Sequence, residues 1–175
     1  NTSLTLSDTH LTYSLHIVEI TEGQIFEDER FIVTCTPLDH NVPSYGYKVI
    51  EKDKPGQLLV EKLNELGIKP GPIYKQIKEN DRTTLADGTI IKQQDVLGPT
   101  KKGKQLAIFG DTRFHASFAS FIQSVDVLVH EATFATENEQ LANEYYHATT
   151  TEAATLAKLA NVQTLICTHI SSRYQ

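Results

Sequence analysis

The sequence predicts a mixed α/β (α+β) domain, with a β-meander first and strands alternating with helices later. Two observations support this prediction. Residues 11–37 and 45–52 contain short apolar segments joined by polar turns, and apolar side chains alternate with polar ones between residues 11 and 20. From residue 104 onward, apolar runs alternate with helical patterns, which is typical of buried parallel strands. The length of 175 residues suits one domain with a buried core.

The meander is expected to begin with a strand at Leu11–Ile20, because side chains alternate there between apolar and polar. The stretch "GQIFEDERFIVTCTPL" then reads as two strands around the acidic turn Glu27–Arg30, and "YGYKVIEK" as another strand. These elements together predict an antiparallel opening to the sheet.

Residues 52–88 are expected to form an inserted, protruding and flexible arm, because Pro and Gly residues repeatedly interrupt two short helical patterns there. Leu58–Leu66 and Ile73–Ile77 provide small apolar faces, neither of which is wide enough to support a core. Between Lys48 and Lys78 the chain has seven lysines and four acidic residues, so this segment is basic.

The second part of the chain is expected to alternate strands and helices. The expected strands are "KQLAIFGD", "VDVLVHEATF" and "VQTLICTH", and the expected helices are "HASFASFIQS", the polar stretch 139–146 and "TTTEAATLAKLA". Thr149 or Thr150 suits the N-cap of the last helix, with Glu152 placed for a capping box.

The formal net charge of −6 argues against indiscriminate nucleic-acid binding by the chain as a whole. Cys35 and Cys167 lie in apolar runs, so we expect buried thiols rather than a disulfide framework. The sequence has neither a signal-peptide pattern at its start nor an apolar run near the roughly 18 residues of a membrane span. The expected location is the cytoplasm, with no membrane contact.

Three side chains of the metal-ligand type follow apolar strands: His40, Asp111 and His169. The carboxyl ends of such strands meet at one rim of an α/β sheet, and divalent metals accept this mixture of imidazole and carboxylate. A single His or Asp at a strand end is more often a loop cap or a hydrogen-bonded core group. Spacing alone leaves both interpretations open.

Other titratable residues near the expected rim have two interpretations each. His147 is either the flank of a helix or a general acid. His130 and Glu131 either orient ligands from a second layer or form an ordinary buried hydrogen-bonded pair. Three further histidines show no partner pattern and are taken as structural or exposed: His10, His16 and His115.

Six motifs resemble, in order and wording, bacterial ribonuclease Z, the tRNA 3′-processing endonuclease of the metallo-β-lactamase superfamily. They are "PLDHNVPSYGYKV", "KPGPIYKQIK", "GDTR", "VDVLVHEATFA", "YYHATTTEAA" and "THISSRY". Six motifs in register are far more specific than any one of them. The resemblance extends from Leu11 to Gln175.

This resemblance implies an αββα sandwich that holds two zinc ions, with His40 on one ion, Asp111 bridging both and His169 on the other. It implies that His147 donates a proton to the leaving 3′-oxygen and that Arg173 contacts a phosphate. In such enzymes two cations stabilise the charge that develops during hydrolysis.

The resemblance further implies that the arm, chiefly Pro55–Lys78, grips the elbow of precursor tRNA. Substrate-binding residues are then expected among its lysines: Lys69, Lys75 and Lys78.

The superfamily motif His-x-His-x-Asp-His is absent from this sequence. Residues 1–175 are therefore expected to be one incomplete metallo-β-lactamase-type domain, an internal piece of a longer enzyme. Alone it should bind zinc weakly, leave precursor tRNA uncut and expose an apolar sheet face that favours a homodimer. Two other functions stay open: a different metallo-β-lactamase-type phosphodiesterase, and a non-catalytic RNA-binding or oligomerisation module.

Overall fold

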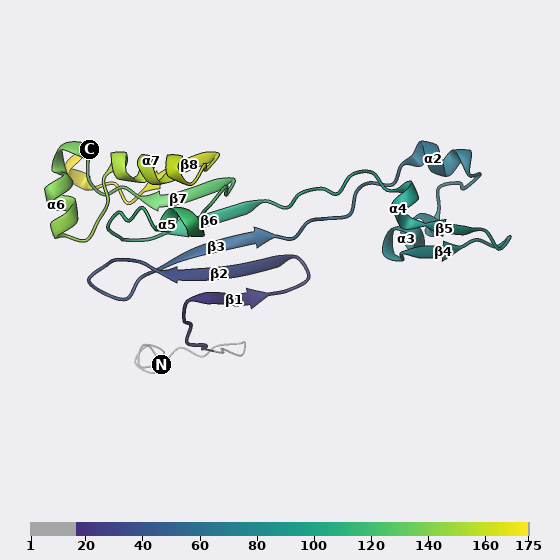
Figure 1. Ribbon diagram of the computed structural model, residues 1–175, viewed down its shortest axis with the longest axis horizontal. Helices are drawn as coiled ribbons and strands as arrows, with labels where there is room; N and C mark the ends of the chain where they lie inside the picture. Colours follow the sequence, from purple (N-terminus) through teal and green to yellow (C-terminus); the bar gives the residue numbers. More distant parts are fainter. Residues whose placement is uncertain (1–16, 175) are drawn as a thin grey trace, which may run out of the picture.

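The main element of the computed structural model, which describes residues 17–174, is a six-stranded sheet in the order β1-β2-β3-β6-β7-β8. The strands are β1 (Gly23–Glu27), β2 (Phe31–Pro37), β3 (Tyr45–Glu51), β6 (Gln105–Phe109), β7 (Val127–Glu131) and β8 (Thr164–Thr168). Neighbouring strands are antiparallel from β1 through β6 and parallel from β6 through β8 (Figure 1). The predicted mixed α/β class, with a meander followed by parallel strands, is confirmed.

The first predicted strand is only partly within the described chain. Leu11 to His16 lie outside the described residues, as does His10, and residues 17–20 have no regular secondary structure. The first described strand begins instead at Gly23.

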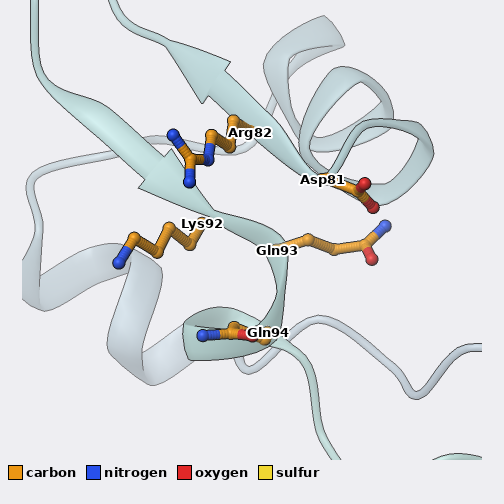
Figure 2. A pocket seen from close by; sticks show the side chains of 5 residues that line it. All are labelled: Asp81, Arg82, Lys92, Gln93 and Gln94. Atoms are coloured by element: carbon orange, nitrogen blue, oxygen red, sulfur yellow. The ribbon is translucent and has the colours of Figure 1, made fainter.

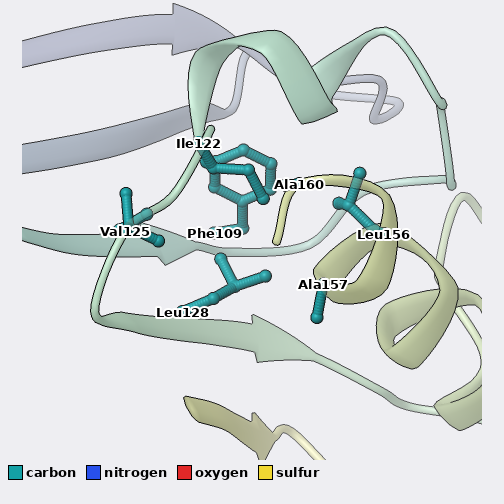
Figure 3. Packing of buried hydrophobic residues seen from close by; sticks show 8 residues of the cluster. Phe109, Ile122, Val125, Leu128, Leu156, Ala157 and Ala160 are labelled. Carbon is teal, nitrogen blue, oxygen red and sulfur yellow. The ribbon is translucent and has the colours of Figure 1, made fainter. Parts of the chain in front are cut away.

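Helices cover one face of the sheet, where the main core lies. The helices of this part are α5 (Phe118–Phe121), α6 (Glu139–Glu144) and α7 (Thr150–Leu159), with 3₁₀ turns η1 (Thr136–Asn138) and η2 (Ser172–Tyr174). Phe109 of β6 and Leu128 of β7 pack with Leu156 of α7 and are almost fully buried (Figure 3). Burying each such side chain stabilises the fold by about 1.5–3 kcal/mol.

A capping box fixes the start of α7. The Thr149 hydroxyl accepts a hydrogen bond from the Glu152 backbone N–H at 3.2 Å, and the Glu152 carboxylate accepts one from the Thr149 N–H at 2.8 Å. This confirms the predicted cap and holds in place the chain just before the helix, which includes His147.

The opposite face of the sheet is apolar and open to solvent. Paired residues on neighbouring strands share a face, so the strand register places seven apolar or aromatic side chains there. The two rows are Val49, Leu106 and Val127, and Tyr47, Ile108, Val129 and Ile166. Ile108 is 41% exposed and Ile166 is 47% exposed. We call this surface the open face.

The chain between β3 and β6 forms the arm, which lies away from the sheet (Figure 1). Its elements are α2 (Val60–Glu65), α3 (Pro72–Glu79), β4 (Arg82–Thr84), β5 (Ile90–Lys92) and α4 (Gln93–Val96). Leu63, Ile68, Ile77, Ile91 and Val96 are buried together in it. The prediction that its apolar faces support no core is therefore wrong, because β5 and α4, beyond the predicted boundary at residue 88, complete that core.

Two closely paired chain segments, residues 52–57 and 98–104, connect the folded part of the arm to the sheet. We call them the stalk. Lys54 and Lys101 exchange two backbone hydrogen bonds of 2.9 Å. A Cβ atom on Gly103 would lie 1.8 Å from the carbonyl oxygen of Glu51, and one on Gly56 would lie 2.0 Å from that of Gly98. Glycine is therefore needed at both positions for the segments to approach this closely.

Candidate metal centre

Asp111 and His169 meet at one edge of the sheet. Asp111 follows the end of β6 and His169 follows the end of β8, and these strands run in the same direction on either side of β7. His169 Nδ1 lies 3.3 Å from Asp111 Oδ1. The structure thus brings together two of the three strand-end residues that the sequence indicated as ligands.

His147 completes a group of three potential ligands. Asp111, His147 and His169 each offer one ligand atom, and these atoms all lie within 4.8 Å of one another. One carboxylate and two imidazoles are a typical protein ligand set for a single zinc ion with an open coordination position. The side chains present therefore fit one such ion.

His40, the third strand-end residue, lies beside this group rather than in it. Its ring centre is 5.5 Å from that of His147, which is in turn 5.4 Å from that of His169. His40 Nδ1 and the carbonyl oxygen of Tyr146 are 3.0 Å apart. The carbonyl can only accept, so Nδ1 donates and Nε2 stays free as a ligand atom.

Left-handed backbone conformations occur next to the site. Tyr146 has a φ of +62° and His169 a φ of +57°. Such conformations are uncommon outside glycine, cost about 1–3 kcal/mol and tend to persist where the surroundings over-determine them. The turn at Tyr146, after α6, presents its carbonyl to His40 and places His147 toward the candidate ligands.

The Glu131 carboxylate is buried directly behind the candidate ligands, with a side-chain exposure of 1%. Five groups donate hydrogen bonds to it. Oε1 accepts from Thr112 N, Ala148 N and His147 Nδ1, and Oε2 accepts from Thr133 N and Thr133 Oγ1, at 2.9–3.1 Å. A buried carboxylate is stable only with such compensation. Glu131 thereby holds His147 with Nε2 turned away from the carboxylate.

His130, although adjacent to Glu131 in sequence, faces the core on the other side of the sheet. Its ring centre is 5.5 Å from that of Phe109, and its Nδ1 donates to the Glu131 carbonyl. Within residues 17–174 its Nε2 has no hydrogen-bond partner. Burial lowers the pKa of His130 below its ordinary value of 6.5, so the ring is neutral at neutral pH.

Arg173 follows the candidate ligands in the final 3₁₀ turn, exposed, with its guanidinium 5.1 Å from the centre of the Phe134 ring. Arg113 was not predicted from the sequence as a site residue, although it belongs to the motif "GDTR". The Arg113 guanidinium lies 3.6 Å from the centre of the Tyr146 ring, and its Nε donates to the Asn143 carbonyl at 2.7 Å. Arg113 and His147 line the same small pocket.

The arm lysines Lys69, Lys75 and Lys78 are exposed and belong to the separate arm, not to the candidate metal centre. Figure 2 shows a hollow on the arm, lined by Asp81, Arg82, Lys92, Gln93 and Gln94. Arg82 and Lys92 are direct cross-strand partners in β4 and β5. That pairing of two cations was missed because residues 82–84 and 90–92 are too short to show a strand pattern.

No family model matches this sequence. Curated relatives do, over 174 residues and 99% of the chain: the proteins named ribonuclease Z from Anoxybacillus flavithermus (55% identical), Geobacillus kaustophilus (53%) and Oceanobacillus iheyensis (55%). The chain is a homologue of ribonuclease Z. It spans 56–57% of the length of these relatives. The recognition made from the six motifs is thus confirmed.

Solved structures agree on the fold of this ribonuclease Z homologue. Human tRNase Z, short form, superposes with a TM-score of 0.53 at 23% identity, over 87% of this chain and 40% of that protein. A metallo-β-lactamase fold protein from Bacillus subtilis gives 0.57 at 16% identity, over 97% and 48%. Yeast RNase Z, long form, gives 0.52 at 17% identity, over 82% and 14%. The predicted metallo-β-lactamase fold is confirmed.

Among the described helices, none combines the length and the apolar character needed to cross a membrane.

Proposed function

We propose that this chain is part of a zinc-dependent endoribonuclease that removes the 3′ trailer from precursor tRNA by phosphodiester hydrolysis. The observation that carries the proposal is the convergence of Asp111, His147 and His169, whose ligand atoms lie within 4.8 Å of one another. The names of its relatives, ribonuclease Z, support the choice of reaction.

In the proposed site, His40, Asp111 and His169 would help to hold two zinc ions, and His147, although close enough to be a ligand, would serve as the acid instead. Bound zinc would supply an activated water and offset the charge on the phosphate. The direct 2.9 Å contact between Glu131 and His147 Nδ1 orients the His147 ring. In its doubly protonated form His147 would keep the Nδ1 proton on Glu131 and donate the Nε2 proton to the leaving 3′-oxygen. Arg173, exposed just beyond His169, is proposed to contact a phosphate.

The arm is proposed to hold the tRNA at a distance from the metal centre. Its exposed Lys69, Lys75 and Lys78 provide positive charge, and the Arg82–Lys92 pair adds two more cations. Binding through so few phosphate contacts should weaken steadily as salt concentration rises. The complete protein is further proposed to act in the cytoplasm as a homodimer.

The chain by itself is proposed to be inactive. Three or four ligands do not make two closed zinc sites, because even a catalytic zinc ion usually has three protein ligands of its own. The test is to assay the chain alone, and the chain joined to the part of the Anoxybacillus flavithermus relative that it does not span, on a 3′-extended tRNA transcript with and without Zn²⁺.

We expect zinc-dependent cleavage at the 3′ end by the joined protein only. Asp111→Asn should abolish that cleavage, whereas Asp28→Asn, a substitution of the same kind at an exposed position between β1 and β2, should leave it unchanged. Cleavage by the chain alone would refute the proposed inactivity. A joined protein that binds zinc but cuts no tRNA would refute the proposed reaction.

Removing the arm distinguishes this function from that of a different phosphodiesterase with the same fold. Because Gln57 and Gly98 are joined by a 2.8 Å backbone hydrogen bond, residues 58–97 can be replaced by a short turn without disturbing the stalk. In the joined protein this deletion should greatly slow tRNA cleavage and spare hydrolysis of bis(p-nitrophenyl) phosphate. Equal loss on both substrates would count against the role of the arm.

A further inference from the structure

We infer that Thr133 is a positioning residue that fixes the tautomer of His169. Thr133 is 8% exposed and lies just beyond the end of β7. Its Oγ1 is 2.9 Å from Glu131 Oε2 and 2.8 Å from His169 Nδ1. Thr133 touches a candidate ligand rather than the substrate. Only its consequence for metal binding rests on the proposed function.

Thr133 Oγ1 also lies 3.3 Å from His147 Nδ1, whose proton goes to Glu131 Oε1 at the shorter distance of 2.9 Å. The proton count around Thr133 then decides the direction of its other two hydrogen bonds. A hydroxyl group has one proton to donate, and a carboxylate can only accept. A hydrogen bond to a charged acceptor is roughly twice as strong as one between neutral groups, so the Thr133 proton goes to Glu131 Oε2. Thr133 Oγ1 must then accept from His169, which places a proton on His169 Nδ1.

Asp111 favours the same arrangement. Its Oδ1 lies 3.3 Å from His169 Nδ1, on which two oxygen acceptors therefore converge. A bare nitrogen lone pair at Nδ1 would face the Asp111 carboxylate without a proton between them. With the proton on Nδ1, the lone pair of His169 is at Nε2, which is the atom left to bind a metal.

Backbone contacts hold the two partners at this distance. The Ala132 N–H donates to the Thr168 carbonyl at 3.0 Å, and the Ser171 N–H donates to the Thr133 carbonyl at 3.1 Å. The chain after β7 is therefore tied to the chain after β8 on both sides of His169. The backbone on both sides of the contact between Thr133 and His169 is therefore fixed by the fold.

One buried carboxylate thus sets the tautomers of two imidazoles. Glu131 Oε1 accepts directly from His147 Nδ1, whereas Glu131 Oε2 acts on His169 through the Thr133 hydroxyl. In both rings Nδ1 is the atom held by these contacts, so Nε2 is the atom left for metal binding at His169 and for proton transfer at His147. Groups that orient metal-binding imidazoles in this way usually change metal affinity about 10–100-fold when removed.

The first test needs no variant and no metal. The 175-residue chain, labelled with ¹⁵N-histidine and kept free of metal, is studied by long-range ¹H–¹⁵N correlation NMR at neutral pH. We expect His169 in the Nδ1–H tautomer. Observation of the Nε2–H tautomer at His169 in the wild-type chain would overturn the inference.

The second test removes the hydroxyl while keeping the shape of the side chain. Thr133→Val should give a mixture of His169 tautomers and weaken Zn²⁺ binding by about 10-fold or more in calorimetry. Thr133→Ser should restore both properties. Thr83→Val is the matched control, because Thr83 is 7% exposed and its Oγ1 has no hydrogen-bond partner within residues 17–174.

An unchanged His169 tautomer in Thr133→Val would show that Asp111 alone sets it and would contradict the inference, as would unchanged Zn²⁺ affinity. If Thr133→Val does not fold, the wild-type tautomer and the serine variant still decide the matter. Loss of nuclease activity plays no part in these readouts. A failure of the proposed endoribonuclease function would therefore leave the tautomer result standing, and the reverse also holds.

Discussion

At the scale of single residues, His130 should make the stability of the chain depend on pH. Burial lowers the pKa of its imidazole, and its contacts with Glu131 offset only part of that effect. As pH falls below about 6.5, the unfolded chain binds a proton at this residue that the folded chain does not, so the free energy of unfolding decreases. The stabilising contribution is present above pH 6.5 and is lost as pH falls toward the folded-state pKa.

The corresponding substitution is His130→Gln, which removes the titration and keeps an amide donor for the Glu131 carbonyl. Urea unfolding at pH 7.5 and pH 5.5 should show a smaller loss of stability on acidification for His130→Gln than for the wild type. His115→Gln serves as the control, because His115 is exposed and its contact with Asp39 lies at the surface, where ion pairs contribute little to stability. Equal losses in the wild type and His130→Gln would show that His130 is not responsible.

The motif "HEATF" illustrates which features of the site could be predicted from the sequence and which could not. His130 and Glu131 were treated as one pair in sequence, but adjacent residues of a strand point to opposite faces, and only Glu131 contacts His147. Asp111 and His169 were predicted to lie near each other because strand ends are visible in a sequence, and the structure places them 3.3 Å apart. The position of His147 depends on the turn at Tyr146, whose left-handed conformation no local pattern indicated.

At the scale of elements, the arm should unfold locally without the sheet. Its core consists of a few side chains centred on Leu63, and it is separate from the core around Phe109. Leu63→Ala should cost the arm about 2–5 kcal/mol, a large share of what so small a core supplies. Amide hydrogen exchange should become faster throughout α2, α3 and β5 and stay unchanged in β6 and β7.

The matched control for this prediction is Leu66→Ala, which changes a residue of the same arm that is 52% exposed. It should leave exchange nearly unchanged in both parts. If Leu63→Ala accelerates exchange in β6 and β7 as much as in the arm, the two parts unfold as one unit and the prediction fails.

The arm core was not predicted because no continuous segment contains it. Leu63 and Ile77 belong to recognisable helical patterns, whereas Ile91 and Val96 come from a three-residue strand and a single helical turn. Periodicity needs longer segments than these to be detected. By contrast, the capping box of α7 was predicted correctly, because all of its signal lies within four adjacent residues.

At the scale of the whole molecule, the open face should make the chain self-associate. Its central residue Ile108 is 41% exposed among apolar neighbours on three strands. Ile108→Lys places a charge that must be desolvated on association, at a cost of several kcal/mol, so the dissociation constant should rise at least about tenfold. Sedimentation velocity measures the change.

The control is Thr155→Lys, which adds the same charge at an exposed position of α7, on the helix-covered side. It should associate like the wild type. A wild-type chain that is fully monomeric and binds no apolar dye would show that the open face does not drive self-association.

The overall architecture was predicted at two levels. Alternating apolar runs indicated the parallel strands, and the six motifs indicated the metallo-β-lactamase fold that the structural comparisons confirm. Which face of the sheet is open was not predictable from periodicity. The central strands are apolar on both faces, so only the register and the position of α7 distinguish the two.

The close approach at Gly56 and Gly103 makes the stalk a spacer of defined length rather than a tether. A paired ribbon lengthens only in steps, at about 3.3 Å for each residue added to both segments. Any ligand that touches the arm and the sheet edge together must match that length. The distance between a contact on the arm and a contact at the sheet edge is therefore set by the number of residues in the stalk. Inserting paired residues would change that distance.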